Sequence, residues 1–170
     1  LKGMGLGGWL VPEGYMLGTW GSPTSIRNRI TDLIGEDSTE AFYEKFEKNY
    51  VAEEDINQLA EWGFNSVRLP FHYKTLSPTY GSFNEKGFSV IDSVIAWCSR
   101  NEIYLILDMH VAPGSQSGDE NADGDEGAKL WDSPENQEWA VDIWGEIARR
   151  YATERWIGGY DLLNLSLIHI

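Results

Sequence analysis

The chain has 170 residues, and its 27 acidic and 13 basic side chains give a formal net charge of −14. Hydrophobic residues make up 42% of it, which is ample material for a core and excludes a disordered or collagen-like protein. The negative charge argues against nucleic acid as a partner, because phosphate backbones bind clusters of Lys and Arg. We expect no membrane partner either, since no apolar stretch approaches the roughly 20 residues that cross a bilayer.

The counts of cysteine and of aromatic residues limit which bonds and ligands the protein can have. The single cysteine, Cys98, permits no internal disulfide and no multi-cysteine metal site. Eight Trp and eight Tyr are more than a core of this size usually takes. Flat sugar rings are one class of ligand that stacks on such aromatic surfaces.

The first half of the chain predicts one strand, a long insertion, a helix and a second strand. The Gly-rich run 3–11 is strand-like, and a helix is expected over 53–62, with acids in its first turn and Gly63 as its stop. Residues 64–71 are short, apolar and β-rich, as buried parallel strands tend to be.

The second half continues the alternation. Phe88, Ile91, Ile95 and Cys98 recur at helical spacing and predict a helix ending near residue 100, with Cys98 in the core. A strand is expected over 103–110. A further helix begins at Ser133, a capping residue followed by proline, and the last strand covers 159–164.

Repeated βα units predict an α/β fold with a parallel sheet and right-handed crossovers. An eight-fold (β/α)8 TIM barrel needs about 250 residues, so four units correspond to its first half, ending after strand 4. A doubly wound open sheet is the competing architecture. Its phosphate-binding turn is poorly matched, because Gly5, Gly7 and Gly8 lie inside the first strand and lead into Trp9 rather than into a helix.

Function in either architecture gathers at the carboxyl ends of the strands. Strand alternation puts Arg68 on one face of the second strand and Asp108 and His110 on one face of the third, pointing into the barrel. A buried guanidinium needs an anionic partner. Asp108 is one candidate and a residue outside this chain is another, and we expect Arg68 to require anions that the chain does not contain. A purely structural ion pair is the alternative.

Two groups of residues suggest a metal site, but neither is complete. Asp108 and His110 alone are too few ligands for a catalytic metal. The loop 119–125 begins like a calcium-binding loop, but Leu130 stands where the closing Glu belongs. We therefore expect no metal and interpret the loop as a solvated acidic segment.

The strand-end segments together resemble the first half of a glycoside hydrolase family 5 catalytic domain. The segments are GLGGWLVPEGY, GFNSVRLPFHY, YLILDMHVAPGSQSG and WIGGYDLLN, spread over residues 3–164 in the order the family has them. The first and third are most similar to the branch that includes exo-β-1,3-glucanases. Bacterial endoglucanase-like members share much of both.

The resemblance implies where catalytic residues belong. In the family the fourth strand ends in Asn-Glu, whose Glu is the general acid/base, and a second Glu on a later strand is the nucleophile. Asn164 matches the Asn, but Leu165 stands where the Glu should be. Residues 165–170 match the translation of a sequencing-library adaptor. We therefore expect a catalytic domain over 1–164, a non-native tail over 165–170, and neither catalytic Glu in this chain.

Other roles carry over by position. Arg68 would orient the nucleophile and depress its pKa, His110 would contribute to the sugar subsite beside the scissile bond, and Asn164 would bond the sugar 2-hydroxyl. The resemblance also implies five sugar-binding positions: Glu13, Glu120, Asn121, Tyr73 and Trp131. Glu120 stands where the family has an Asp, and Tyr73 and Trp131 would stack on sugar rings.

The chemistry implied is retaining hydrolysis of β-glucan oligo- or polysaccharides by two carboxylates about 5–5.5 Å apart, with no cofactor. Family analogy also implies a secreted, cell-surface or periplasmic protein that is monomeric at full length. Two alternatives stay open. One is a non-catalytic carbohydrate-binding barrel, suggested by Leu165, and the other is a metal-dependent hydrolase built on Asp108 and His110.

Overall fold

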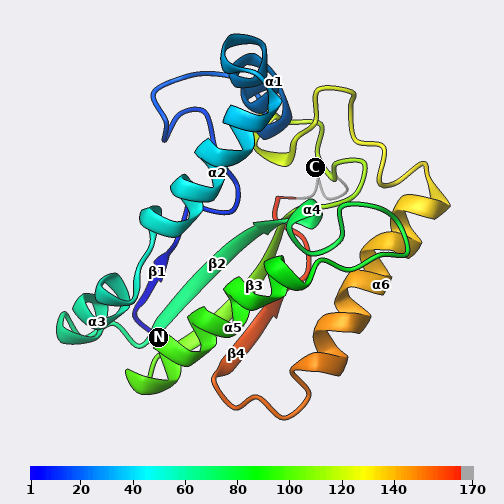
Figure 1. Cartoon of the computed structure of the whole chain (residues 1–170). Helices are drawn as coiled ribbons and strands as arrows, with labels where there is room; N and C mark the ends of the chain where they lie inside the picture. The colour runs from blue at the N-terminus through cyan, green and yellow to red at the C-terminus, as the bar shows by residue number, and fades with distance from the viewer. Residues whose placement is uncertain (166–170) are drawn as a thin grey trace.

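The computed structural model describes residues 1–165, and four parallel strands form its centre (Figure 1). They are β1 (Gly3–Gly5), β2 (Ser66–His72), β3 (Tyr104–Val111) and β4 (Ile157–Asp161), hydrogen-bonded in the order β1-β2-β3-β4. Strand order follows chain order, as in consecutive βα units of a barrel. Residues 166–170, which make up most of the expected tail, lie outside the described residues.

Six helices and a short 3-10 turn connect the described strands. The helices are α1 (Pro23–Ile34), α2 (Glu36–Tyr50), α3 (Glu53–Glu61), α4 (Tyr73–Leu76), α5 (Glu85–Arg100) and α6 (Pro134–Arg150). The turn, η1 (Glu120–Ala122), lies in the long loop after β3. The expected helices after the first, second and third strands are thus confirmed as α3, α5 and α6.

Side-chain caps explain where two of these helices begin. The Ser133 hydroxyl accepts a hydrogen bond from the Asn136 backbone at 3.3 Å, and Pro134 opens α6 without leaving an N–H unpaired. Asn84 caps α5 in the same way, accepting from the Lys86 backbone at 3.2 Å. Both helices then bury an apolar stripe against the sheet.

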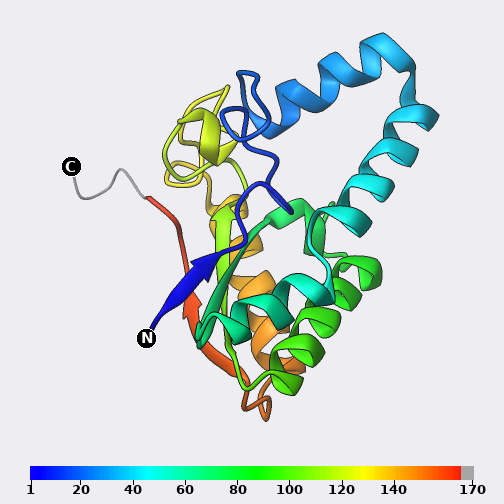
Figure 2. The same cartoon turned by 90° about the vertical axis from the view of Figure 1, so that its left-hand side faces the viewer.

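The sheet has one face covered by helices and one that is not. In Figure 2, α3, α5 and α6 all lie on one side of the strands. The side chains facing them are completely buried and include Leu69 on β2 and Leu107 on β3. No helix of residues 1–165 covers the other face, which carries Arg68 and Asp108. The strand alternation therefore placed these polar residues on the correct face.

The segment between β1 and β2 departs from the sequence-based expectation. The first strand ends at Gly5 rather than residue 11, although Leu10 still forms an isolated parallel bridge with Phe71. The long insertion contains α1 and α2, which the sequence did not predict. They meet at Gly35, whose φ of 80° lets the chain turn sharply between them. Figure 2 shows both helices extending beyond the sheet.

Cys98 lies on the apolar face of α5 with no exposed surface, as expected of a core residue. Burial raises the pKa of its thiol to about 12. None of the helices described for residues 1–165 is long and apolar enough to cross a membrane.

Candidate active site

Arg68 is the centre of a polar network on the uncovered face of the sheet. Its Nη2 atom lies 2.9 Å from Asp108 Oδ2 and 2.8 Å from Asp161 Oδ2, and its Nε also donates to Asp161 at 3.1 Å. The same Nη2 donates to Asn164 Oδ1 at 2.9 Å. Three strands thus supply one guanidinium and its acceptors.

This network corrects one expectation. We predicted that Arg68 needs anions outside the chain, whereas Asp108 and Asp161 both lie within it. Asp108 was one of the two candidates, but Asp161 was missed. The reason is the β3–β4 register, which shifts between Leu105 and Ile106 and so brings Asp161 opposite Asp108. A sequence pattern carries no signal for such an irregularity.

His110 connects the network to a second carboxylate. Its Nδ1 lies 2.7 Å from Asp108 Oδ2, and its Nε2 lies 3.6 Å from Glu13 Oε1 and 3.3 Å from Asn164 Nδ2. Burial opposes protonation of the ring, but hydrogen bonds to Asp108 and Glu13 outweigh it and raise the pKa of His110 to about 9. The site therefore holds an imidazole ring beside a guanidinium, with acidic groups between and around them.

Gln116 fixes the backbone around these side chains. Its Nε2 donates to the His110 and Asn164 carbonyl oxygens, each at 2.8 Å, and its Oε1 accepts from the Ala112 backbone at 3.1 Å. Sequence reasoning missed this fully buried residue. Its only signal was its place inside the third family-like segment.

A small cavity opens directly beside the network. Its volume is about 240 Å³, and its lining includes Glu120, Asn121 and Asn164. Three of the expected site residues therefore share one hollow at the strand ends. The Glu120 carboxylate also accepts a hydrogen bond from the Gly21 backbone at 3.1 Å, which ties it to the N-terminal insertion.

The two expected stacking residues are placed differently. Trp131 is half-buried, and its indole N–H donates to the Gln116 carbonyl at 2.9 Å, which brings it close to the network. Tyr73 begins α4 and packs edge-on against Trp139 with ring centroids 5.0 Å apart. Burial raises the pKa of Tyr73 to about 12. The stacking role of both rings stays a prediction.

The acidic loop 119–125 is only partly the solvated segment that we expected, because Asp119, Glu120 and Asp125 are exposed but the Asp123 side chain is largely buried. Asp123 accepts hydrogen bonds from the Thr24 backbone at 2.8 Å and from the Thr24 hydroxyl at 2.6 Å, and Asp125 accepts from Ser22 at 2.6 Å. These carboxylates anchor the start of α1 to the loop after β3. Within residues 1–165 no group of three or more His, Cys, Asp or Glu side chains is arranged to hold a metal ion.

His72 completes this anchor as a neutral ring. Its Nδ1 accepts a hydrogen bond from the Lys74 backbone at 3.1 Å, so the proton must sit on Nε2, which lies 3.1 Å from Asp123 Oδ2. Burial lowers the pKa of His72, in agreement with this geometry.

Polar side chains gathered at the carboxyl ends of parallel strands are the arrangement in which proteins of the α/β-barrel class build their functional sites. The family description "Cellulase (glycosyl hydrolase family 5)" matches residues 28–164. The chain belongs to glycosyl hydrolase family 5, and the resemblance seen in its strand-end segments is confirmed.

Curated relatives show how much of the family this chain represents. It is 35% identical over 167 residues to a "Beta-xylosidase" of Phanerodontia chrysosporium, covering 96% of this chain and 35% of that protein. It is 38% identical over 128 residues to "Endoglucanase C" of Acetivibrio thermocellus, covering 72% of this chain and 36% of the relative. The chain thus spans little more than a third of the length of these relatives.

A solved structure supports the same fold. The rutinosidase of Aspergillus niger superposes with a TM-score of 0.75 at 16% identity, covering 97% of this chain and 48% of that one. At this identity the likeness concerns the fold alone. The four-stranded sheet accordingly corresponds to part of a (β/α)8 barrel, as expected.

Proposed function

We propose that this chain is the first half of a retaining glycoside hydrolase that acts on β-glucan oligo- or polysaccharides. The observation that carries the proposal is the contact of Asn164 with both Arg68 and His110 at the ends of three neighbouring strands. The nearness of an amide, a guanidinium and an imidazole supports a site at which a sugar would meet a nucleophilic carboxylate. Membership of the family supplies the reaction class.

Each residue then has a chemical role. Asn164 bonds the sugar 2-hydroxyl, an interaction that strengthens in the transition state. Arg68, held by Asp108 and Asp161, orients the nucleophile and stabilises its ionised form. His110 and Glu13, whose side chains lie 3.6 Å apart, would together line one side of the subsite next to the scissile bond. In the natural protein we expect the acid/base Glu directly after Asn164 and the nucleophile on a later strand.

The substrate class rests on sequence similarity and on the small cavity. The name of the endoglucanase relative and the likeness to exo-β-1,3-glucanases favour a β-glucan, which Glu13, Glu120 and Asn121 would bind with the stacking rings Tyr73 and Trp131. The β-xylosidase relative makes xylosides the first alternative to assay. We further propose that the full protein is secreted or held at the cell surface or in the periplasm, where polymeric glucans are accessible.

Substitution of Asn164 in the full-length protein tests the proposal. Asn164→Ala should lower kcat on a β-glucan roughly 100-fold, because one donor to the transition state is lost. Asn49→Ala, an exposed change on α2, should leave the rate unchanged. Reducing-sugar release measures both. Equal rates for the two variants, or a gene without Glu codons after Asn164 and on a later strand, would overturn the assignment.

A non-catalytic carbohydrate-binding protein is the second candidate, and the observation in its favour is Leu165 in the place of the acid/base Glu. Retention of β-glucan by a full-length protein that releases no reducing sugar would support it instead.

A further inference from the structure

The loop 12–22, which precedes α1, concentrates exposed apolar side chains. Tyr15, Met16, Leu17 and Trp20 are between 37% and 74% exposed. Single apolar residues scattered over a surface are ordinary, but several on one short loop mark a binding surface. Figure 2 shows this loop beside the one that follows β3, near the carboxyl ends of the strands. A ligand of the loop would therefore lie next to the strand-end site.

Two hydrogen bonds join this loop to carboxylates of the candidate active site. The Tyr15 hydroxyl donates to Glu13 Oε1 at 3.2 Å. The Gly21 backbone N–H donates to Glu120 Oε2 at 3.1 Å, and Glu120 lines the small strand-end cavity. Both carboxylates belong to the expected sugar-binding positions. Since Trp20 directly precedes Gly21, its exposed ring is attached to the rim of the site.

Arg29 on α1 holds the Trp20 ring in place. Its guanidinium carbon lies over the indole, 4.8 Å from the ring centre, and its Nη2 donates to the Trp20 carbonyl oxygen. The same nitrogen also lies 3.4 Å from the Thr19 hydroxyl. One face of the indole is therefore supported by Arg29, while 74% of the Trp20 surface stays exposed. A flat apolar ring that is both fixed and open to solvent is suited to stack on a sugar.

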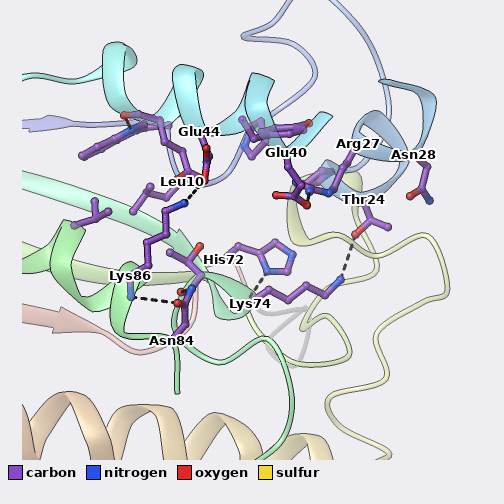
Figure 3. Close-up of a pocket in the computed structure, with 18 residues that line it drawn as sticks. Leu10, Thr24, Arg27, Asn28, Glu40, Glu44, His72, Lys74, Asn84 and Lys86 are labelled. Carbon is purple, nitrogen blue, oxygen red and sulfur yellow. Dashed lines mark hydrogen bonds and ion pairs between the residues drawn. The ribbon is translucent and has the colours of Figure 1, made fainter. Parts of the chain in front are cut away.

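The helix behind this ring is itself anchored. Its first turn is bound to the loop after β3, because Asp123 accepts two hydrogen bonds from Thr24. Figure 3 shows further contacts of the same helix, in which Arg27 pairs with Glu40 of α2. Lys74 Nζ also lies 3.4 Å from the Thr24 hydroxyl. A ring supported by an anchored helix loses little conformational freedom when a ligand binds it, which favours affinity.

The strand-end cavity by itself is too small for a polymer. Its volume of about 240 Å³ lies below the roughly 300 Å³ at which small-molecule sites usually begin. A longer chain must therefore continue over the rim, where loop 12–22 meets Glu120. The formal net charge of −14 disfavours an acidic polysaccharide, so the ligand that fits this rim is a neutral one.

We propose that Trp20, supported by Arg29, is a stacking platform for an outer sugar unit of the substrate and gives the enzyme a preference for glucan chains over single sugars. This inference rests on the proposed function, because it extends the same site. Trp20 would contact the chain away from the scissile bond, so its contribution is equal in the ground state and in the transition state. The platform therefore lowers KM and leaves kcat unchanged.

Kinetics of the full-length protein on cellopentaose and laminaripentaose test the platform. Trp20→Ala should raise KM about ten-fold on the pentasaccharide that is cleaved, with kcat unchanged, because one stacking contact is lost. Trp20→Phe keeps an aromatic ring and should stay within about three-fold of the parent KM. Arg29→Gln keeps the indole but frees it, and should raise KM about three-fold. Trp62→Ala is the matched control, since this indole is 60% exposed but lies between α3 and the start of β2, at the opposite end of the sheet.

The inhibition constant of glucose checks that each variant is folded, because a single sugar can occupy the strand-end cavity without reaching the ring. It should be the same in all variants, and a change in Trp20→Ala alone would overturn an outer position of the ring. Equal KM values for Trp20→Ala and Trp62→Ala, with pentasaccharide cleavage intact, would overturn the platform and leave the proposed function standing.

If the parent protein cleaves neither pentasaccharide, the proposed function fails and titration calorimetry decides the platform separately. Tighter binding of a pentasaccharide by the parent than by Trp20→Ala would support the platform. Equal binding by the two proteins, or no binding by either, would overturn it.

Discussion

Arg68 illustrates how a single side chain can organise a site. A guanidinium facing the inside of a sheet needs acceptors for its N–H groups, and here two carboxylates and one amide from neighbouring strands provide them. Asp161 contributes the two contacts that fix the plane of the group, because it accepts from both Nε and Nη2. Asp161 is therefore a positioning residue for Arg68.

We expect Asp161→Asn in the full-length enzyme to lower kcat about ten-fold with little change in KM, because a tilted guanidinium would misplace the nucleophile. Steady-state kinetics on a β-glucan measure both constants. Asp142→Asn, an exposed change on α6, is the matched control. A rise in KM with an unchanged kcat would show that Asp161 acts in binding rather than in orientation.

His110 gives the molecule a specific dependence on pH. Its pKa, about 9 when folded, lies above the unfolded value of about 6.5, so its contribution to stability is fully present below pH 6.5 and is lost as the pH rises through 9. The contribution amounts to about 3 kcal/mol. Denaturant unfolding of the full-length protein and of His110→Gln should therefore converge between pH 6.5 and 10. A constant difference over that range would contradict a protonated ring.

At the scale of elements, the loop after β3 and the start of α1 depend on each other. Asp123 receives two hydrogen bonds from Thr24 and one contact from His72, all within 3.1 Å. These interactions, together with the Ser22–Asp125 bond, attach α1 to the loop at the sheet end. A change in this loop should therefore be felt in a helix about a hundred residues away in sequence.

Asp123→Asn should lower the free energy of unfolding by about 2 kcal/mol and speed amide exchange in α1. Asparagine tolerates the left-handed backbone at this position, where φ is 54°, so the variant removes the charge without adding strain. Asp119→Asn in the same loop is the control, since the Asp119 side chain is exposed. Unchanged exchange in α1 would mean that apolar packing alone holds the helix.

Some elements could be predicted from sequence because they bury much surface. α5 buries six residues at helical spacing, and this stripe is visible in the sequence. α1 buries only Pro23 and Ile26, and α2 only Thr39 and Tyr43, so neither shows such a stripe. Helices that project from the sheet lack the periodic pattern that prediction relies on.

The site divides in the same way. Arg68, Asp108 and His110 could be placed together because strand alternation and the shared sheet edge require it. The position of Asp161 beside Arg68 results from a register shift between β3 and β4, and Gln116 lies in an irregular loop. Neither position could be predicted from the sequence. Long-range registers and loop paths arise from the complete packing, and a local pattern does not encode them.

At the scale of the whole molecule, the described sheet has two unpaired edges, β1 and β4. One face of the sheet also lacks any covering helix within residues 1–165. Open edges and uncovered faces favour association between chains. In a closed barrel the same edges would be paired and the same face would be interior.

The polypeptide 1–170, expressed by itself, should therefore aggregate or form a molten state, and it should show no glycoside hydrolysis. Size-exclusion chromatography, binding of a hydrophobic dye and a thermal scan measure this. The full-length protein is the control and should elute as a monomer. A soluble monomer of 1–170 with one cooperative thermal transition would contradict the prediction.

The burial of Cys98 makes the protein its own reporter of core opening. A thiol with no exposed surface and a pKa raised to about 12 does not react with alkylating reagents while α5 is packed on the sheet. The rate at which Cys98 is alkylated therefore measures how often α5 separates from the sheet and exposes the thiol. Cys98 is the single cysteine of residues 1–170, so alkylation of the peptide that contains it reports the opening of α5 without any engineered label.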